Sequence, residues 1–323
     1  MSNFQSEREI RDLFRINDVI DLKGIDCKIL RCDKPKVNGG RGEPKTDAYI
    51  LLENIQNRTT YELKLTIKKA NADFLENKIR AERAEVIFGP HWKERISAYI
   101  ESIKEKFLTR EILYKQGQYN GSITLGWRFE IVNKTNGDLS GEAKFNYKEL
   151  LEIYSGPNLD DNKKNAKIGN DNNPTSLSGV ADYILVCTEY HYKSAQEVIN
   201  AMEPINEYIK DHQTVYFVCK ALNYQTFKDT IEGDRSLSVY INWENRNGLL
   251  TPEFVFDSPL EKSGKEIRDK LKKTLSELHI NTTDDINEIN LEQIIKSKTI
   301  KHNSYRNNLQ GGRPKEEQLS FDI

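Results

Sequence analysis

Two acids and a lysine stand near one another in the N-terminal part of the chain. Asp47 opens the apolar stretch 48–54, and Glu62 and Lys64 lie two positions apart in the next such stretch, 59–67. Residues two apart on a strand project to the same face, so Glu62 and Lys64 are expected to point together. Asp47 is expected to reach that face from the start of the neighbouring strand.

These three side chains could together hold a divalent metal ion against a phosphate. Carboxylate and backbone oxygens make the hard, all-oxygen site that suits Mg²⁺, with Mn²⁺ as a substitute. The metal polarises a phosphate and lowers the pKa of a bound water, and a lysine offsets the charge that develops during hydrolysis. The pattern therefore favours phosphodiester hydrolysis.

A purely structural interpretation of the same hairpin stays open. Alternation along a surface strand also places an acid and a lysine on one polar face, with the intervening residues buried. Against this alternative, Lys68 and Lys69 follow on the second strand, so its polar side becomes more basic toward its end. A phosphate-binding cleft has that character.

The elements that must position these residues are of both kinds. The periodicity predicts a helix over 4–15, an antiparallel hairpin around the turn 55–58, and a helix over 194–211 that Pro204 kinks. Hairpins and crossovers both occur along the chain. This order predicts an α/β fold with a mixed central sheet flanked by helices.

Composition bounds the class of protein. With 323 residues, the chain has room for one large domain or two ordinary ones. The net charge of −2 does not by itself indicate a nucleic-acid binder, and the four cysteines form no CxxC pair. The sequence has no apolar run near the roughly 20 residues of a membrane span and no signal peptide, so we expect a cytoplasmic protein without a membrane partner.

The composition shifts along the chain predict four parts. The catalytic core is expected over 1–155, and a polar loop or linker rich in Asn, Gly and Pro over 156–175. A C-terminal α/β region over 176–298 would grip DNA or extend the core. The basic end, 299–323, is expected to be a flexible tail.

The hairpin residues resemble the signature of the PD-(D/E)xK nuclease superfamily. That signature is an acid at the start of one strand, a variable gap, and acid-x-lysine on the next strand. Here it is Asp47, a gap of 14 residues, and Glu62-Leu63-Lys64, with Pro44 three places before the first acid and not directly before it. Residues 20–155 together resemble a type II restriction endonuclease with its α/β core.

The resemblance implies a role for each residue of the signature. Asp47 and Glu62 would be the metal ligands, with the Leu63 carbonyl as a third oxygen. Lys64 would orient the attacking water or help to deprotonate it.

Further residues are candidates for supporting roles. The resemblance implies an accessory acid on the N-terminal helix, for which Glu7 and Glu9 are available; ordinary helix-surface acids are the alternative. Arg, Lys and Asn side chains contact phosphates and base edges. The DNA-binding candidates are Lys45, Thr46, Lys68, Lys69, Lys163, Lys164, Lys167, Arg306 and Arg313.

The function that the resemblance implies is sequence-specific, Mg²⁺-dependent cleavage of double-stranded DNA that leaves a 5′-phosphate. A two-fold symmetric target favours a homodimer, and a cognate DNA methyltransferase would protect the host's own sites. Two alternatives stay open: a nuclease of the same superfamily in DNA repair or anti-phage defence, and a DNA-binding protein without catalysis.

Overall fold

The computed structural model describes residues 5–40, 42–70, 74–135, 137–188 and 190–292, and its fold is of the mixed α/β class. The chain divides into two units. The first consists of Met1–Ser102 with Phe129–Lys220, and the second of Ile103–Arg128 with Ala221–Ile323. Within the described residues, no helix has the length and apolar character needed to cross a membrane.

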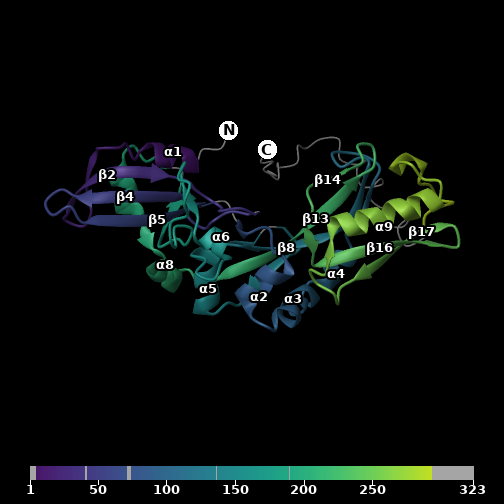
Figure 1. Cartoon of the computed structure of the whole chain (residues 1–323). Helices are drawn as coiled ribbons and strands as arrows, with labels where there is room; N and C mark the ends of the chain where they lie inside the picture. The colour runs from purple at the N-terminus through teal and green to yellow at the C-terminus, as the bar shows by residue number, and fades with distance from the viewer. Residues whose placement is uncertain (1–4, 41, 71–73, 136, 189, 293–323) are drawn as a thin grey trace, which may run out of the picture. The chain divides into compact units, whose positions relative to one another are not determined.

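The first unit is built around a six-stranded mixed sheet in the order β1-β2-β4-β5-β11-β12 (Figure 1). Neighbouring strands run antiparallel, except that β11 runs parallel to β5. The strands are β1 (Val19–Asp21), β2 (Asp26–Asp33), β4 (Ala48–Asn54), β5 (Thr60–Lys69), β11 (Tyr183–Cys187) and β12 (Glu203–Pro204).

The core of this sheet lies against helices α1 (Glu7–Asp12) and α7 (Ala195–Ala201). It contains Ile10 and Phe14 from the α1 region, Val198 and Ile199 from α7, and alternate residues of the strands: Ala48, Ile50, Leu52, Leu63, Leu65, Ile67, Leu185 and Cys187. The other residues of β4 and β5 therefore face away from this core. Those include Tyr49, Glu62, Lys64 and Thr66.

Helix α1 begins where the sequence contains a capping box. The Ser6 hydroxyl accepts a hydrogen bond from the Glu9 amide at 3.2 Å, and the Glu9 carboxylate accepts one from the Ser6 amide at 2.6 Å. This exchange satisfies two backbone donors at the helix start. The helix ends earlier than predicted, with Leu13 as its C-cap.

Pro204 interrupts the helical stretch more strongly than the predicted kink. The stretch forms two helices, α7 and α8 (Ile205–Asp211), with Glu203 and Pro204 extended between them as β12. Proline cannot donate the hydrogen bond that would continue a helix. Helix α8 then packs on α5 (Tyr147–Tyr154), where the rings of Tyr154 and Tyr208 meet edge to face with centroids 5.5 Å apart.

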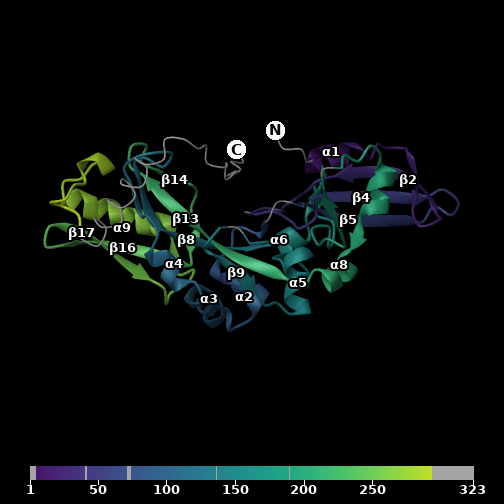
Figure 2. The same cartoon turned by 180° about the vertical axis from the view of Figure 1, so that it is seen from behind.

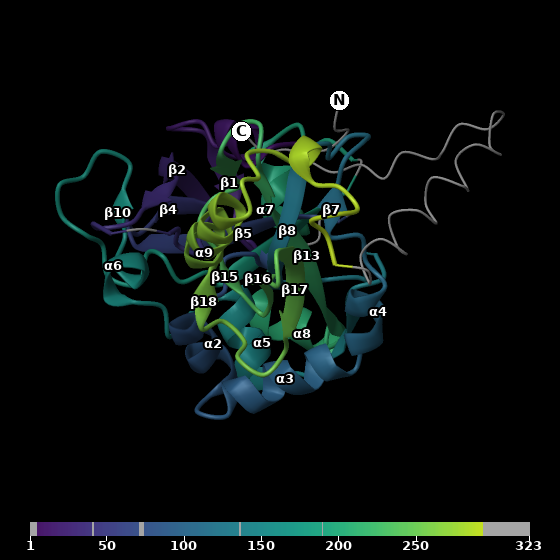
Figure 3. The same ribbon diagram turned by 90° about the vertical axis from the view of Figure 1, so that its right-hand side faces the viewer.

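The unit boundaries differ from the expected boundaries at 155 and 176. Strand β11 pairs with β5, so residues after 176 complete the N-terminal sheet. A parallel pair needs a long crossover connection, and residues 156–175 form part of that crossover. They contribute α6 (Asp161–Lys164) and β10 (Lys167–Ile168), which Figure 3 shows. Strand β10 pairs antiparallel with β3 (Pro35–Lys36). The expected tail, 299–323, lies outside the described residues.

A second large sheet has the order β14-β13-β8-β16-β17 and extends into both units, because β8 (Ser122–Val132) and β13 (Val215–Gln225) contribute residues to each (Figure 2). In the second unit, helix α9 (Gly264–Glu277) packs on β16 (Val239–Arg246). The other elements are β6 (Phe74–Glu76), α2 (Ala81–Phe88), α3 (Trp92–Glu101), α4 (Lys104–Leu108), β7 (Leu113–Tyr114), β9 (Ser140–Ala143), β14 (Thr230–Ile231), β15 (Ser236–Leu237), β17 (Leu249–Val255), β18 (Lys262–Ser263) and the 3₁₀ turn Thr283–Asp285.

Candidate functional site

Asp47 lies at the point where β4 begins, buried to 8% exposure. Its carboxylate oxygen Oδ2 accepts hydrogen bonds from the Ile67 amide at 2.7 Å and from the Thr66 hydroxyl at 3.1 Å. The Lys68 ammonium lies 3.9 Å from the same oxygen. Asp47 therefore faces the end of β5.

The expected convergence of Glu62 with Asp47 does not occur, because the hairpin register separates them. Leu51 is the partner of Glu62 across the hairpin, and Leu65 is the partner of Ala48, so Asp47 stands beside Thr66. Glu62 and Thr66 are four residues apart on β5, and a strand rises roughly 3.3 Å per residue, so they lie about 13 Å apart along the strand.

Glu62 and Lys64 have other partners. Burial raises the pKa of the Tyr49 hydroxyl, and the bond from that hydroxyl to Glu62 raises it further. The Lys64 ammonium lies 3.1 Å from Asp182 Oδ2 and donates to the Leu177 carbonyl at 3.3 Å.

Leu63, the expected third metal ligand, is also separated from Asp47. Its cross-strand partner is Ile50, and its side chain is buried in the core. Its backbone therefore lies three positions along β5 from the residue that Asp47 faces, Thr66. The expected metal set of Asp47, Glu62 and Leu63 is not assembled.

The N-terminal helix supplies an acid whose charge acts on Asp47. Arg11 donates a hydrogen bond from Nη1 to the Asp47 carbonyl at 3.0 Å, and the same nitrogen lies 3.8 Å from Glu7 Oε2. Lys34 Nζ lies 2.9 Å from Glu7 Oε2. The structure thus brings Glu7, Lys34 and Asp47 to one place. Glu9 serves instead as the cap of its own helix.

The electrostatics of this cluster favour an added cation. Burial raises the pKa of the Asp47 carboxyl group; the charge of Lys68 opposes that rise, and the charge of Glu7 adds to it. A nearby positive charge stabilises the ionised form of a buried carboxylate. A divalent ion between Asp47 and Glu7 would supply that charge.

The donor set fits Mg²⁺ or Mn²⁺. Within the described residues, the contacts to the Asp47 carboxylate go to Oδ2, which leaves Oδ1 for a ligand, and the Glu7 side chain is 41% exposed. The described part of the chain has no group of three or more His, Cys, Asp or Glu that could hold a metal ion. Mg²⁺ commonly uses one or two protein carboxylates, with water and substrate phosphate as its other ligands.

The residues next to Asp47 are buried. Lys45 is paired with Glu76 at 2.7 Å, and burial lowers its pKa to about 8, although Glu76 opposes the shift. Thr46 is 1% exposed, and among the described residues its hydroxyl has no hydrogen-bond partner. Neither side chain is part of an open surface.

Four other DNA-binding candidates, Lys69, Lys163, Lys164 and Lys167, are exposed or partly exposed. Lys163 and Lys164 pair with Asp160 and Asp161 at the start of α6, at 2.8 and 3.3 Å. Lys69 at the exposed end of β5 and Lys167 in β10 have no ion pair among the described residues. Arg306 and Arg313 are outside the described residues.

Lys34, Arg11 and the pairing of Asp47 with Lys68 were not part of the sequence prediction. One signal in the sequence could have revealed the pairing of Asp47 with Lys68. Counting outward equally from the centre of the turn 55–58 pairs residue 54 with 59 and residue 47 with 66, as the structure has it. Lys34 and Arg11 are 13 and 36 residues from Asp47, and no local pattern places them.

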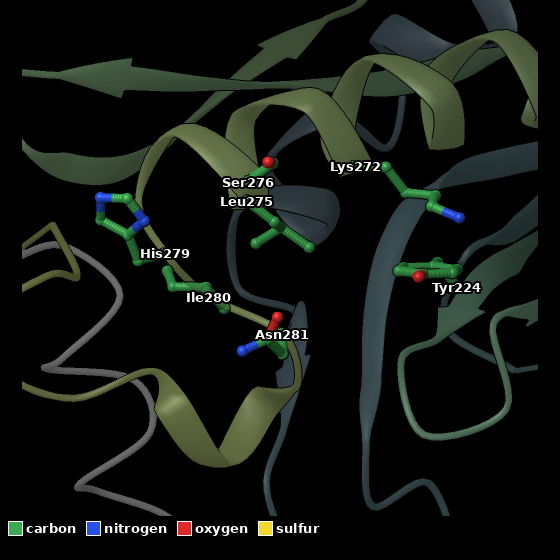
Figure 4. Close-up of a pocket in the computed structure, with 7 residues that line it drawn as sticks. All are labelled: Tyr224, Lys272, Leu275, Ser276, His279, Ile280 and Asn281. Carbon is green, nitrogen blue, oxygen red and sulfur yellow. The ribbon is translucent and has the colours of Figure 1, made fainter.

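The second unit contains a separate open hollow of about 350 Å³, lined by Tyr224, Lys272, Leu275, Ser276, His279, Ile280 and Asn281 (Figure 4). Lys272 binds the Asp229 carboxylate at 2.7 and 2.8 Å, and the Tyr224 hydroxyl donates to the same carboxylate at 3.0 Å. The charge that lines the hollow is therefore already paired.

Comparison of the chain with protein-family models, with curated proteins and with solved structures found no match.

Proposed function

We propose that this chain is a metal-dependent nuclease of the PD-(D/E)xK kind that cleaves double-stranded DNA, as a type II restriction endonuclease does. The observation that carries the proposal is the buried Asp47 carboxylate at the start of β4, with Lys68 3.9 Å away and with the charges of Glu7 and Lys34 acting on it. A mixed sheet that presents an acid on one strand and a lysine on the next supports it.

The geometry assigns the roles differently from the sequence signature. Asp47 and Glu7 would hold Mg²⁺, which would polarise the scissile phosphate and activate a water. Lys68, in place of Lys64, is the lysine positioned to donate to that water or to a phosphate oxygen. Lys34 adds a second positive charge where a phosphate would bind.

The remaining features of the proposal follow from the resemblance. Attack by water would leave a 5′-phosphate, Mn²⁺ would replace Mg²⁺, and a homodimer would match a two-fold symmetric site. A methyltransferase of the same specificity would be the functional companion of the enzyme.

The test is cleavage of phage DNA by the purified protein with Mg²⁺, compared with Lys68→Ala, Lys64→Ala and an EDTA control. We expect discrete bands from the wild type and from Lys64→Ala, and a loss of about 10²- to 10³-fold in rate for Lys68→Ala. Intact DNA in every lane, with Mn²⁺ as well, would contradict a nuclease. A loss of cleavage in Lys64→Ala but not in Lys68→Ala would assign the catalytic role to Lys64, as in the sequence signature.

One observation favours a second candidate, a DNA-binding protein without catalysis. The residue beside Asp47 on β5 is Thr66, whereas the signature calls for an acid there. A binding protein would shift the mobility of a DNA duplex in the presence and absence of Mg²⁺ and leave it uncut. A nuclease of the same superfamily in repair or defence would cut without the sequence preference of a restriction enzyme.

A further inference from the structure

A chain of buried charges leads from helix α5 to Lys45. Lys45 Nζ lies 2.7 Å from Glu76 Oε1, and Arg83 donates to the same oxygen through Nε at 3.2 Å. Arg83 pairs in turn with Glu152 on α5. These four residues are called the ion chain below.

The members of the ion chain are shielded from water. The exposed side-chain fractions are 12% for Lys45, 13% for Glu76, 15% for Arg83 and 2% for Glu152. Moving ions out of water costs free energy that their attraction often only offsets, so buried ion pairs are weak contributors to net stability. The ion chain is therefore better explained by the geometry that it imposes on the groups it contacts.

Lys45 is also held by backbone groups on two other segments, and a third segment lies close to its side chain. Its ammonium donates to the Leu75 carbonyl at 3.1 Å, and its amide donates to the Gly179 carbonyl at 2.9 Å. At Gly156, where φ is +75°, an added Cβ would lie only 2.7 Å from Lys45 Cγ. The loop after α5 therefore leaves space for the lysine stem.

The far end of the ion chain is anchored as well. The Glu152 carboxylate accepts a hydrogen bond from the Asn158 amide at 2.8 Å, and Arg83 also donates to the Glu152 carbonyl at 3.2 Å. Helices α2 and α5 and the loop after α5 are thereby tied to the segment that leads into β4.

We propose that Glu76, Arg83 and Glu152 are positioning residues that hold Lys45, and with it the extended segment from Lys45 to Asp47, so that the Asp47 carboxylate is fixed in its place at the start of β4. The proposal rests on the proposed nuclease function, in which Asp47 belongs to the site. It adds the residues that pre-organise the site: a carboxylate fixed beforehand loses less conformational entropy when its ligand binds.

The chain offers a matched control one helical turn away. Glu149 on α5 is buried like Glu152, and it pairs with Arg95 on α3. Glu149→Gln removes a similar buried carboxylate from the same helix, but the pair it breaks leads to α3 and not to Lys45.

The first readout is the cleavage rate on duplex DNA with saturating Mg²⁺, at temperatures where circular dichroism shows every variant to be folded. We expect Glu76→Gln and Arg83→Met to lose about 10²-fold in rate, and Glu149→Gln to stay within about 2-fold of the wild type. Equal losses in all three variants would overturn the positioning role, and so would unchanged rates in Glu76→Gln and Arg83→Met.

The second readout does not depend on activity. Hydrogen exchange of the amides of Lys45, Thr46 and Asp47 should become faster in Glu76→Gln and stay as in the wild type in Glu149→Gln. No local change in Glu76→Gln, or the same change in Glu149→Gln, would overturn the inference. A wild-type protein that cuts no DNA but shows the expected exchange would refute the nuclease and keep the positioning network.

Discussion

At the scale of single residues, the central feature is a buried carboxylate with a lysine ammonium beside it. Asp47 accepts bonds from Thr66 and Ile67 through one oxygen, and Lys68 lies 3.9 Å from that oxygen. Burial disfavours the ionised form of Asp47, as the raised pKa of its carboxyl group indicates. The site is therefore suited to gaining a cation.

The first prediction concerns Asp47→Asn. A carboxyl group whose pKa is raised in the folded state destabilises that state as pH rises through the titration range, so the neutral amide should raise the melting temperature at pH 7 in the absence of metal. The variant should also lose the stabilisation that added Mg²⁺ or Mn²⁺ gives the wild type. Differential scanning fluorimetry with and without metal measures both effects. An unchanged metal response would exclude Asp47 as a ligand.

At the scale of elements, the strand start at Asp47 depends on segments that come from elsewhere in the chain. The loop before β4 is hydrogen-bonded to Gly179. Strand β6 carries Glu76, and α2 carries Arg83. The ion chain joins these elements through Lys45, Glu76, Arg83 and Glu152. Changes in either the loop or the ion chain should therefore reach the site.

The second prediction concerns the loss of stability at low pH. Burial alone would raise the pKa of Glu76, but Lys45 and Arg83 outweigh it and lower that pKa to about 2. The unfolded chain then binds more protons than the folded one as pH falls from about 4.5 to about 2, and up to about 3 kcal/mol of stability is lost across that window. Urea unfolding at pH 5 and pH 3 should show a smaller pH effect for Glu76→Gln than for the wild type. An equal pH effect in both proteins would contradict the lowered pKa.

The third prediction concerns Gly179→Ala. An added Cβ at this position would lie 1.8 Å from the Lys163 carbonyl oxygen, a backbone atom that cannot rotate away. We expect a loss of about 1–3 kcal/mol in the free energy of unfolding, as for other overpacked positions. Because the Gly179 carbonyl binds the Lys45 amide, the DNA cleavage rate should fall as well. Chemical denaturation measures the stability, and wild-type stability in the variant would contradict the close approach.

At the scale of the whole molecule, charge is nearly balanced. The net charge of −2 gives no general attraction to DNA. Under the proposed function, electrostatic attraction to DNA would come from local groups, and Lys34 and Lys68 are the lysines whose charges act on Asp47.

The fourth prediction is the salt dependence of DNA binding, measured by fluorescence anisotropy with Ca²⁺ in place of Mg²⁺. Each lysine–phosphate contact contributes about −0.9 to the slope of log K against log salt. Lys34→Ala and Lys68→Ala should each make the slope less negative by about that amount. Lys64→Ala is the control, because its ammonium is bound to Asp182, and its slope should equal that of the wild type. Identical slopes for all variants would remove these lysines from the DNA contact.

Local signals in the sequence were enough for several features. Alternation and turn chemistry predicted the hairpin around 55–58, and the period of the apolar residues predicted the helices at each end of the sheet. The mixed α/β class followed from their order. These signals work because each depends on residues within about ten positions of one another.

Alternation puts Lys64 and Lys68 on the same face of β5, and the hairpin register, which counting from the turn 55–58 gives, selects Lys68 as the partner of Asp47. Only the tertiary structure decided which charged groups of distant segments meet. Glu7 and Lys34 reach the site, and Glu76 and Glu152 are joined through Arg83, because segments far apart in the chain pack together. No short pattern encodes such contacts, since their free energy depends on burial and pairing that exist only in the folded chain.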